Sequence, residues 1–219
     1  MLFPELISIS QPAWEAYSQT ETKRPLTVAV IDTGVDISHP DLQGSIWVNE
    51  DEIPGDGIDN DGNGYVDDVN GWNFVSNSNE ICTGEEDSHG THGAGTIAAT
   101  WNNGGIAGIT DNTHVKLMVL KALGGSDGKG SPESVIEAMK YAEANGADIC
   151  NLSFGSGNCT PEFEAAIRDF KVQIEDIRSI QNTGPELQQS KVMGSRRKPD
   201  MLAAVAIGPF GLWGANMMW

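Results

Sequence analysis

Residues 28–42, VAVIDTGVDISHPDL, place a lone carboxylate directly after an apolar strand. The run at 26–31 is apolar and partly β-branched, which predicts a strand buried on both faces of a sheet. Asp32 ends this run, and a Thr-Gly turn follows it. A carboxylate at such a position either shapes the turn or serves a site beyond the strand end, so the residues that join it decide its role.

A second segment, DSHGTHGAGTIAA at 87–99, supplies a histidine to the same candidate site. Small residues follow His89, and they predict a helix over 89–100 that packs closely on the sheet. An aspartate and a histidine are two thirds of a Ser-His-Asp triad, in which the imidazole takes a hydroxyl proton and the carboxylate orients the ring. His92 lies one helical turn after His89, and we expect it to be packed rather than catalytic.

The remaining pattern alternates strands with helices. Apolar runs predict strands at 115–122 and 147–154, and a Ser-Pro or Thr-Pro pair predicts the start of a helix at 131 and at 160. The first of these helices is expected to end at Gly146 and the second near residue 178. This order predicts an α/β fold with a mostly parallel sheet and helices on both faces, in a single domain over 1–219. Residues 43–80 are rich in Gly, Asn and Asp, which predicts a long loop.

The composition limits the classes of partner. The chain of 219 residues is long enough for one sizeable core, and its formal net charge of -18 argues against nucleic acid and anionic membranes as partners. The apolar stretch at 201–219 is interrupted by Gly and Pro and predicts strand and turn, not a membrane span. The cysteines have irregular spacing and indicate neither a disulfide framework nor a metal site, and Cys150 is predicted to be a core residue.

Three segments resemble the subtilases, the subtilisin-like serine proteases. They are VAVIDTGVDISHPDL at 28–42, HGTHGAGTIAA at 89–99 and ADICNLSFG at 147–155. The resemblance is strong over 12–165 and weaker after that. It implies a subtilisin-like fold, serine-type endopeptidase activity, and a polypeptide substrate bound in extended conformation by a monomer. It also implies that Asp32 orients the imidazole of His89, the general base.

The same resemblance implies two edges that bind a substrate. Ser153, Phe154 and Gly155 would form one edge after a strand, and Gly128 and Gly130 of the DGKG segment would form the other. Small residues there let a peptide pair with the backbone as an added strand. A plain surface turn is the other interpretation of these glycines.

The chain departs from the family pattern where the nucleophile is expected. Family members carry a late Gly-Thr-Ser-Met-type segment, and none of the serines after Ser156 follows Gly-Thr. Asn182, in an Asn-Thr-Gly turn, resembles the family's oxyanion donor, and residues 200–211 resemble one of its strands. We therefore expect a catalytic domain that is truncated before its serine, with an incomplete C-terminal part and no proteolytic activity of its own.

A non-catalytic domain that binds calcium and holds extended peptides is the alternative function. Metal-dependent hydrolysis is a third interpretation, because His89 and His92 lie on one helix, but the Glu of a His-Glu-x-x-His motif is missing.

An acidic segment without basic residues, 50–68, predicts a cation site within the 43–80 loop. It contains the first part of an EF-hand-like calcium loop, in which oxygen ligands alternate along the chain and a glycine permits the sharp turn. The pattern residues are Asp59, Asp61, Asn63, Gly64, Tyr65 (through its carbonyl) and Asp67. The final Glu is absent, so Glu52, Asp56 and Asp68 are candidates to complete the ligand shell. A solvated acidic loop is the other interpretation.

The resemblance to subtilases supports Ca²⁺ as the cation. Some subtilases carry a similar insertion, DGxDxDxNGYxDD, and bind calcium there. Asp41 and Asn102 resemble ligands of another calcium site in the family. The family also implies an extracellular location, although no signal peptide is predicted at the start of the chain.

Overall fold

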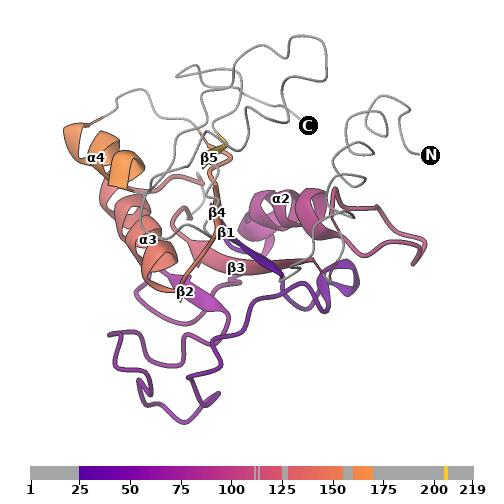
Figure 1. Ribbon diagram of the computed structural model, residues 1–219, viewed down its shortest axis with the longest axis horizontal. Helices are drawn as coiled ribbons and strands as arrows, with labels where there is room; N and C mark the ends of the chain where they lie inside the picture. Colours follow the sequence, from indigo (N-terminus) through magenta and orange to yellow (C-terminus); the bar gives the residue numbers. More distant parts are fainter. Residues whose placement is uncertain are drawn as a thin grey trace, which may run out of the picture.

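Parallel strands form the central sheet of the computed structural model, which describes residues 25–110, 112, 114–124, 128–154, 160–169 and 205–206. Within these residues the strands lie in the order β2-β3-β1-β4-β5 (Figure 1). Their bounds are Leu26–Asp32 for β1, Gly71–Asn73 for β2, Val115–Lys121 for β3, Ile149–Asn151 for β4 and Val205–Ala206 for β5. β1 is central, so Asp32 lies in the middle of the edge formed by the carboxyl ends of the strands.

Helices cover both faces of this sheet (Figure 1). α2 (Ser88–Ala98) lies on one face, and α3 (Pro132–Ala144) and α4 (Pro161–Asp169) lie on the other. Two short 3-10 turns, η1 (Pro40–Leu42) and η2 (Glu85–Asp87), contact α2. The predicted α/β fold with a parallel sheet is confirmed. None of the helices in the described ranges is long and apolar enough to cross a bilayer.

The two-sided cover explains why β1 is apolar without a break. Val28 and Val30 pack in the core layer beneath α2, whereas Ala29 and Ile31 pack in the layer beneath α3, and all four are at most 4% exposed. Successive side chains of a strand point to opposite faces, so a strand covered on both sides needs apolar residues at every position. By the same alternation, Asp32 continues the stripe that faces α2.

The predicted Ser-Pro helix start forms α3. The Ser131 hydroxyl accepts a hydrogen bond from the backbone N–H of Ser134 at 3.1 Å, and Pro132 is the first residue of the helix. Gly146 follows the helix with a φ of 73°, a left-handed conformation that favours glycine. The second predicted helix is α4, and its expected extension to about residue 178 lies outside the described residues.

Two elements differ from the prediction. The 43–80 segment is not entirely a loop, because β2 lies within it and pairs with β3. Gly71 opens β2 at a φ of 125°, and a Cβ atom there would lie 1.9 Å from the carbonyl oxygen of Val119. This pairing therefore requires glycine, although glycine-rich composition favours a loop. β4 is shorter than the predicted 147–154 strand, since its pairing with β1 ends at Asn151.

Replacement of Ile31 by Ala should destabilise the fold by about 2–5 kcal/mol, because the side chain is fully buried and its loss leaves a cavity. Ile53→Ala is the matched control, since Ile53 is 60% exposed. That variant should change the free energy of unfolding by less than about 0.5 kcal/mol. Urea unfolding followed by circular dichroism measures both, and equal losses would contradict the two-sided burial of β1.

Candidate active site

A hydrogen bond joins the predicted acid and base. Asp32 is fully buried at the end of β1, and His89 is near the start of α2 with 56% of its side chain exposed. Nδ1 of His89 lies 2.7 Å from Oδ1 of Asp32. An ionised carboxylate only accepts, so Nδ1 donates and Nε2 of the neutral ring keeps a free lone pair. The exposed ring can therefore take a proton from a group that approaches from solvent.

Small residues bring the start of α2 against the end of β1. The N–H of Thr33 donates to Asp32 Oδ1 at 2.7 Å, so this oxygen also receives a backbone hydrogen bond. The N–H of Gly90 donates to Thr33 Oγ1 at 3.1 Å. A Cβ atom on Gly90 would lie 2.1 Å from the carbonyl oxygen of Gly34. Any larger residue would therefore push α2 and His89 away from the carboxylate.

A buried lysine lies beneath the same turn. Lys121 ends β3 and is 2% exposed, and its ammonium group donates to the carbonyl oxygen of Thr33 and to Asp87 Oδ1, the latter at 2.6 Å. Glu86 Oε1 is 3.2 Å from the same nitrogen. Burial alone would raise the pKa of the Asp87 carboxyl, but the hydrogen bonds from Lys121 and from backbone N–H groups lower that pKa overall. A buried ion pair thus adjoins the Asp32–His89 pair.

One predicted substrate edge lies beside the carboxyl end of β3. Residues 128–130 are exposed and fold back along this end, where the N–H of Gly124 donates to the carbonyl oxygen of Lys129 at 2.9 Å. A Cβ atom on Gly130 would lie 2.2 Å from the carbonyl oxygen of Ala122, and Gly128 has a φ of 62°. Both glycines are therefore needed for the path of this segment.

The other predicted edge follows β4. Ser153 is exposed, and its hydroxyl exchanges hydrogen bonds of 2.9 and 3.2 Å with the side-chain amide of Asn151. Phe154 is half-buried against the core layer that contains α3. The predicted site residues Gly155 and Asn182 lie outside the described residues.

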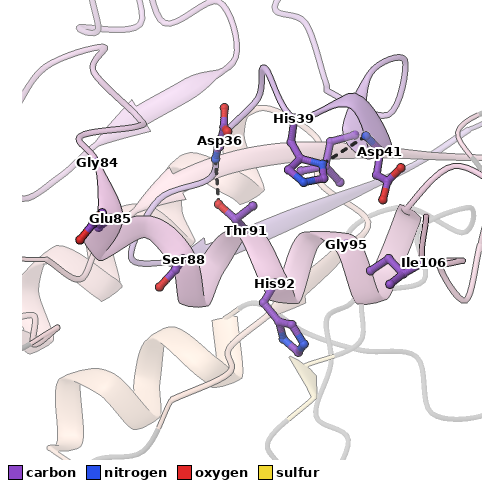
Figure 2. A pocket seen from close by; sticks show the side chains of 11 residues that line it. Asp36, His39, Asp41, Gly84, Glu85, Ser88, Thr91, His92, Gly95 and Ile106 are labelled. Carbon is purple, nitrogen blue, oxygen red and sulfur yellow. Dashed lines mark hydrogen bonds between the residues drawn. The ribbon is translucent and has the colours of Figure 1, made fainter. Parts of the chain in front are cut away.

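A pocket of about 390 Å³ lies between α2 and the 36–42 segment (Figure 2). Its lining residues include Asp36, His39, Asp41, Thr91 and His92. Neither Asp32 nor His89 lines it. The prediction that His92 is packed is wrong, because its side chain is exposed. The reason is helix geometry: α2 buries Ala94 and Ala98 against the sheet, and His92 points away from that face.

Acidic side chains converge in the 43–80 loop, which extends from the sheet below β2 in Figure 1. Carboxylate oxygens of Glu52, Asp61 and Asp68 all lie within 4.8 Å of one another, and Glu52 and Asp68 are buried. Within the described part of the chain, this acidic trio is the one group of at least three acidic, histidine or cysteine side chains close enough to share a metal ion. That group does not include His89 or His92, so nothing in it supports metal-dependent hydrolysis.

Hydrogen bonds fix the acidic trio in place. The amide of Asn49 donates to Asp61 Oδ2 and to Asp68 Oδ1, each at 3.0 Å. Glu52 Oε1 accepts backbone N–H groups of the loop, the shorter bond being 2.7 Å. The hydroxyl of Tyr141, on α3, donates to Asp68 Oδ2 at 2.5 Å. Burial and the Asp68 carboxylate raise the pKa of Tyr141, so its hydroxyl stays protonated and remains a donor.

Other predicted ligands of the loop shape its backbone. Asp59 accepts hydrogen bonds from the N–H groups of Asn63 at 3.0 Å and Gly64 at 2.8 Å. Asp67 accepts from the N–H groups of residues 55, 56 and 57. Asp56 Oδ1 accepts from the N–H of residue 58 at 2.8 Å. These carboxylates hold the turns that bring the acidic trio together.

The Tyr65 ring joins the loop to the core. It packs edge-on against Trp72 of β2 and against Tyr141 of α3, with ring centres 5.1 and 5.0 Å apart. The loop therefore lies on the α3 side of the sheet, and its carboxylates are connected to that side through Tyr141.

Asp41 lies against the segment that follows α2. Its Oδ1 accepts from the Asn103 amide at 2.5 Å, and a Cβ atom on Gly105 would lie 2.4 Å from its Oδ2. Its carbonyl oxygen accepts from the N–H of Thr100 at 2.8 Å. Asn102, the other predicted ligand, is exposed with a φ of 62°. The segment thus contacts the Asp41 carboxylate through Asn103.

The Subtilase family model matches residues 23–210, a range that contains the Asp32–His89 pair and both predicted edges. The chain belongs to the subtilase family. The family resemblance of the sequence is therefore confirmed.

Known relatives of this subtilase are longer proteins. The major intracellular serine protease of Bacillus subtilis (strain 168) is 35% identical over 166 residues, which are 76% of this chain and 45% of that protein. Subtilisin-like protease 1 of Plasmodium vivax is 38% identical over 155 residues, 70% of this chain and 23% of that protein. Fervidolysin from Fervidobacterium pennivorans, a keratinolytic enzyme related to subtilisin, matches with a TM-score of 0.51 and 26% identity, over 75% of this chain and 22% of that one. This subtilase chain spans less than half the length of these relatives.

Sequence reasoning missed Lys121 and Asp87 in this subtilase. One signal was available, because a lysine that ends a buried apolar strand requires a partner for its charge. The identity of that partner depends on the contact between β3 and the turn before α2, which the sequence pattern does not give.

Asp87→Asn should destabilise this subtilase more at neutral pH than in acid. The folded chain holds the pKa of Asp87 below its ordinary value, so the unfolded chain takes up the proton first as the pH falls. The stability contributed by Asp87 is therefore complete above about pH 5 and is lost as the pH falls through the folded-state pKa. Urea unfolding of both proteins from neutral to acidic pH measures the gap, which should narrow in acid. A gap that does not change with pH would contradict the ion pair with Lys121.

Proposed function

We propose that Asp32 and His89 are the acid–base pair of a subtilisin-like serine-type endopeptidase site, which acts on polypeptides in extended conformation. The 2.7 Å hydrogen bond between Asp32 Oδ1 and His89 Nδ1 carries this proposal. Membership of the subtilase family supports it, and so do relatives that are named as a serine protease and a subtilisin-like protease.

The chemistry assigned to this pair is proton transfer. Nε2 of His89 takes the proton of a hydroxyl as its oxygen bonds to the substrate carbonyl carbon, and later delivers the proton to the leaving amine. The ring is an imidazolium between these steps, and the buried carboxylate of Asp32 stabilises that charge. The exposure of His89 supports its role as the group that meets solvent and substrate.

Substrate would bind along the 128–130 and 153–155 edges. An extended peptide pairs with exposed backbone as an added strand, and side chains as small as glycine leave room for it. The first edge is linked to Asp32 through residues 122–124. The N–H groups of Ala122 and Leu123 donate to the carbonyl oxygen of Asp32 at 2.9 and 3.1 Å, and the N–H of Gly124 donates to the carbonyl oxygen of Lys129 in the edge. This connection would hold the bound peptide at a fixed place relative to His89.

We also propose that the 219-residue chain does not hydrolyse peptides by itself. Its sequence contains no Gly-Thr-Ser segment to supply the attacking hydroxyl. Loss of the nucleophile from a Ser-His-Asp triad costs on the order of a million-fold in turnover, which leaves ~10³–10⁴ over water from binding and oxyanion stabilisation. Asn182 is the residue that we assign to the oxyanion, on its sequence context.

Calcium-dependent binding of extended peptides without cleavage is the second candidate function. The acidic trio, the exposed 128–130 edge and the exposed Ser153 favour it, because none of these features requires a nucleophile. A pseudoprotease of this kind would use the edges to hold a peptide, and His89 would have no proton to transfer.

We propose Ca²⁺ as the ion of the acidic trio. Calcium prefers carboxylate, carbonyl and amide oxygens, and the trio supplies carboxylates from three separate turns. Carboxylates so close together repel one another, more strongly because Glu52 and Asp68 are buried, and a divalent cation would offset this repulsion. The further candidate ligands are Asp56, Asp59, Asn63, the Tyr65 carbonyl and Asp67, with Asp41 and Asn102 for a second ion.

Treatment of the purified chain with a fluorophosphonate probe should label no serine, because the sequence contains no Gly-Thr-Ser segment to supply a hydroxyl for activation by His89. Intact-mass spectrometry measures the label. Cleavage of an unstructured polypeptide, followed in parallel by gel electrophoresis, should also be undetectable. Labelling or cleavage that disappears in His89→Ala would overturn the proposed inactivity and would support the role of His89.

Binding separates the two candidate functions. If the chain holds peptides without cutting them, a fluorescein-labelled, unstructured peptide should bind to it and stay intact. The fluorescence anisotropy of the peptide measures the binding. Gly130→Val should reduce this binding, since a side chain there collides with the carbonyl oxygen of Ala122 and the side chain of Leu123. Ala165→Val, on an exposed position of α4, is the control. No binding by the wild-type chain would refute the pseudoprotease candidate.

Calcium should raise the melting temperature relative to chelator, because an ion that binds only the folded state stabilises it by about 2.7 kcal/mol at a hundred times its Kd. Glu52→Gln should remove most of this shift, since Glu52 is buried in the acidic trio. Asp51→Asn is the matched control, because Asp51 is an exposed acid of the same loop, and it should retain the shift. Differential scanning fluorimetry makes the comparison, and an unshifted wild-type melt would count against Ca²⁺.

A further inference from the structure

Lys121 connects the end of β1 to the start of α2. The β1–β3 ladder pairs Asp32 with Lys121 as its last pair. Leu117 and Val119 of β3 pack in the layer beneath α2, and strand alternation puts Lys121 on that same face. The lysine thus ends an apolar stripe at the point where α2 begins.

The ammonium group contacts both segments at once. It donates to the carbonyl oxygen of Thr33, in the turn after β1, and to the carboxylate of Asp87, the residue directly before α2. The other oxygen of Asp87 accepts the N–H groups of Thr83 and Gly84, the latter at 2.9 Å. Lys121 is therefore a non-covalent cross-link between the two turns that carry the acid and the base.

The turn after β1 leaves little room for adjustment. Thr33 donates its N–H to Asp32 Oδ1 and accepts the N–H of Gly90 through Oγ1. A Cβ atom on Gly34 would lie 2.5 Å from Asp87 Oδ1. A shift of Thr33 or Asp87 would therefore displace the atoms that keep the carboxylate within hydrogen-bond distance of His89.

Besides linking the two turns, Lys121 neutralises the charge of a buried carboxylate. Asp32 and Asp87 are both at most 1% exposed, so two carboxylates are buried against the turn formed by Thr33 and Gly34. Burial of ion pairs often adds no stability over apolar residues of similar size, so stability alone does not explain a lysine here. With Lys121 paired to Asp87, the charge of Asp32 remains available to orient the ring.

We propose that Lys121 is a positioning residue for the Asp32–His89 pair. It acts through Thr33 and Asp87, and it contacts neither the ring nor a substrate. This inference rests on the proposed function of the pair. It adds to that function the residue that keeps the carboxylate within hydrogen-bond distance of the imidazole.

The tautomer of His89 tests the proposal in the full chain. An Asp32 carboxylate held at Nδ1 fixes the proton there, so wild-type His89 should be almost entirely in the Nδ1–H form. Long-range proton–nitrogen correlation spectra of chain labelled with ¹⁵N-histidine, at a pH where the rings are neutral, report each ring separately. His89→Gln assigns the His89 signals, and Asp32→Asn should abolish the preference.

The double variant Lys121→Met/Asp87→Asn removes the cross-link without leaving a lone buried charge. We expect it to fold, by circular dichroism, and to lose the dominance of the Nδ1–H form in favour of a mixture of tautomers. Lys116→Met is the matched control, because Lys116 lies at the other end of β3 and also donates to a backbone carbonyl, that of Gly44. The control should leave the His89 tautomer unchanged, even where it lowers the melting temperature.

The outcomes separate the two ideas. A wild-type His89 without a dominant Nδ1–H form would refute the Asp32–His89 pair itself. A dominant Nδ1–H form that survives in a folded double variant would refute the role of Lys121 and leave the pair intact. If the double variant does not fold, Lys121→Met decides the question, since it removes the ammonium group while Asp87 keeps the N–H groups of Thr83 and Gly84. An unchanged tautomer in the folded Lys121→Met variant refutes the proposal, and a partial loss supports it.

Discussion

The register between β1 and β3 is the constraint on which the candidate site depends. The two strands pair from Leu26 with Val115 to Asp32 with Lys121, so a carboxylate and an ammonium group end neighbouring strands on the same face. A slip of one residue would move every side chain of a strand to the opposite face. Such a slip would move the residues that pack beneath α2 into the layer beneath α3, and the reverse. The packing of these two apolar layers therefore prevents it. The packing of the core therefore also sets the place of Asp32.

The start of α2 accounts for the unusual composition of HGTHGAGTIAA. Each glycine within a helix costs up to about 1 kcal/mol relative to alanine. Gly90 nevertheless has no alternative, since a Cβ atom there would collide with the carbonyl oxygen of Gly34 and lie 3.2 Å from the Cβ of Asp32. Ala94 and Ala98 extend the same narrow face along the helix. Small residues thus let the helix axis approach the sheet closely enough for His89 to contact a carboxylate that is fully buried.

The features that the sequence could predict are local or carried by the family resemblance. Strand β1, the Ser-Pro start of α3 and Gly146 after its end follow from patterns of a few residues. The contact between Asp32 and His89, 57 residues apart, followed from the resemblance to subtilases and not from periodicity. β2, the exposure of His92 and the contacts of Lys121 were not predictable, because each depends on which surfaces meet in the folded chain. The acidic trio is intermediate: its spacing indicated oxygen ligands, but the fold selects Glu52 and Asp68 among several acids.

The acidic loop and the Asp32–His89 pair lie on opposite faces of one sheet. Tyr65 and Tyr141 connect the loop to the α3 layer, whereas His89 belongs to the α2 layer. An ion bound by the trio would relieve repulsion among carboxylates on the α3 side and strengthen the attachment of the loop to β2 and α3. A bound ion could change the geometry of the Asp32–His89 pair only by moving the sheet between them. The apolar core layers of the sheet are close-packed and change little in shape. Cation binding is therefore expected to set the stability of the domain, while the contacts around Thr33 set the geometry of the acid and base.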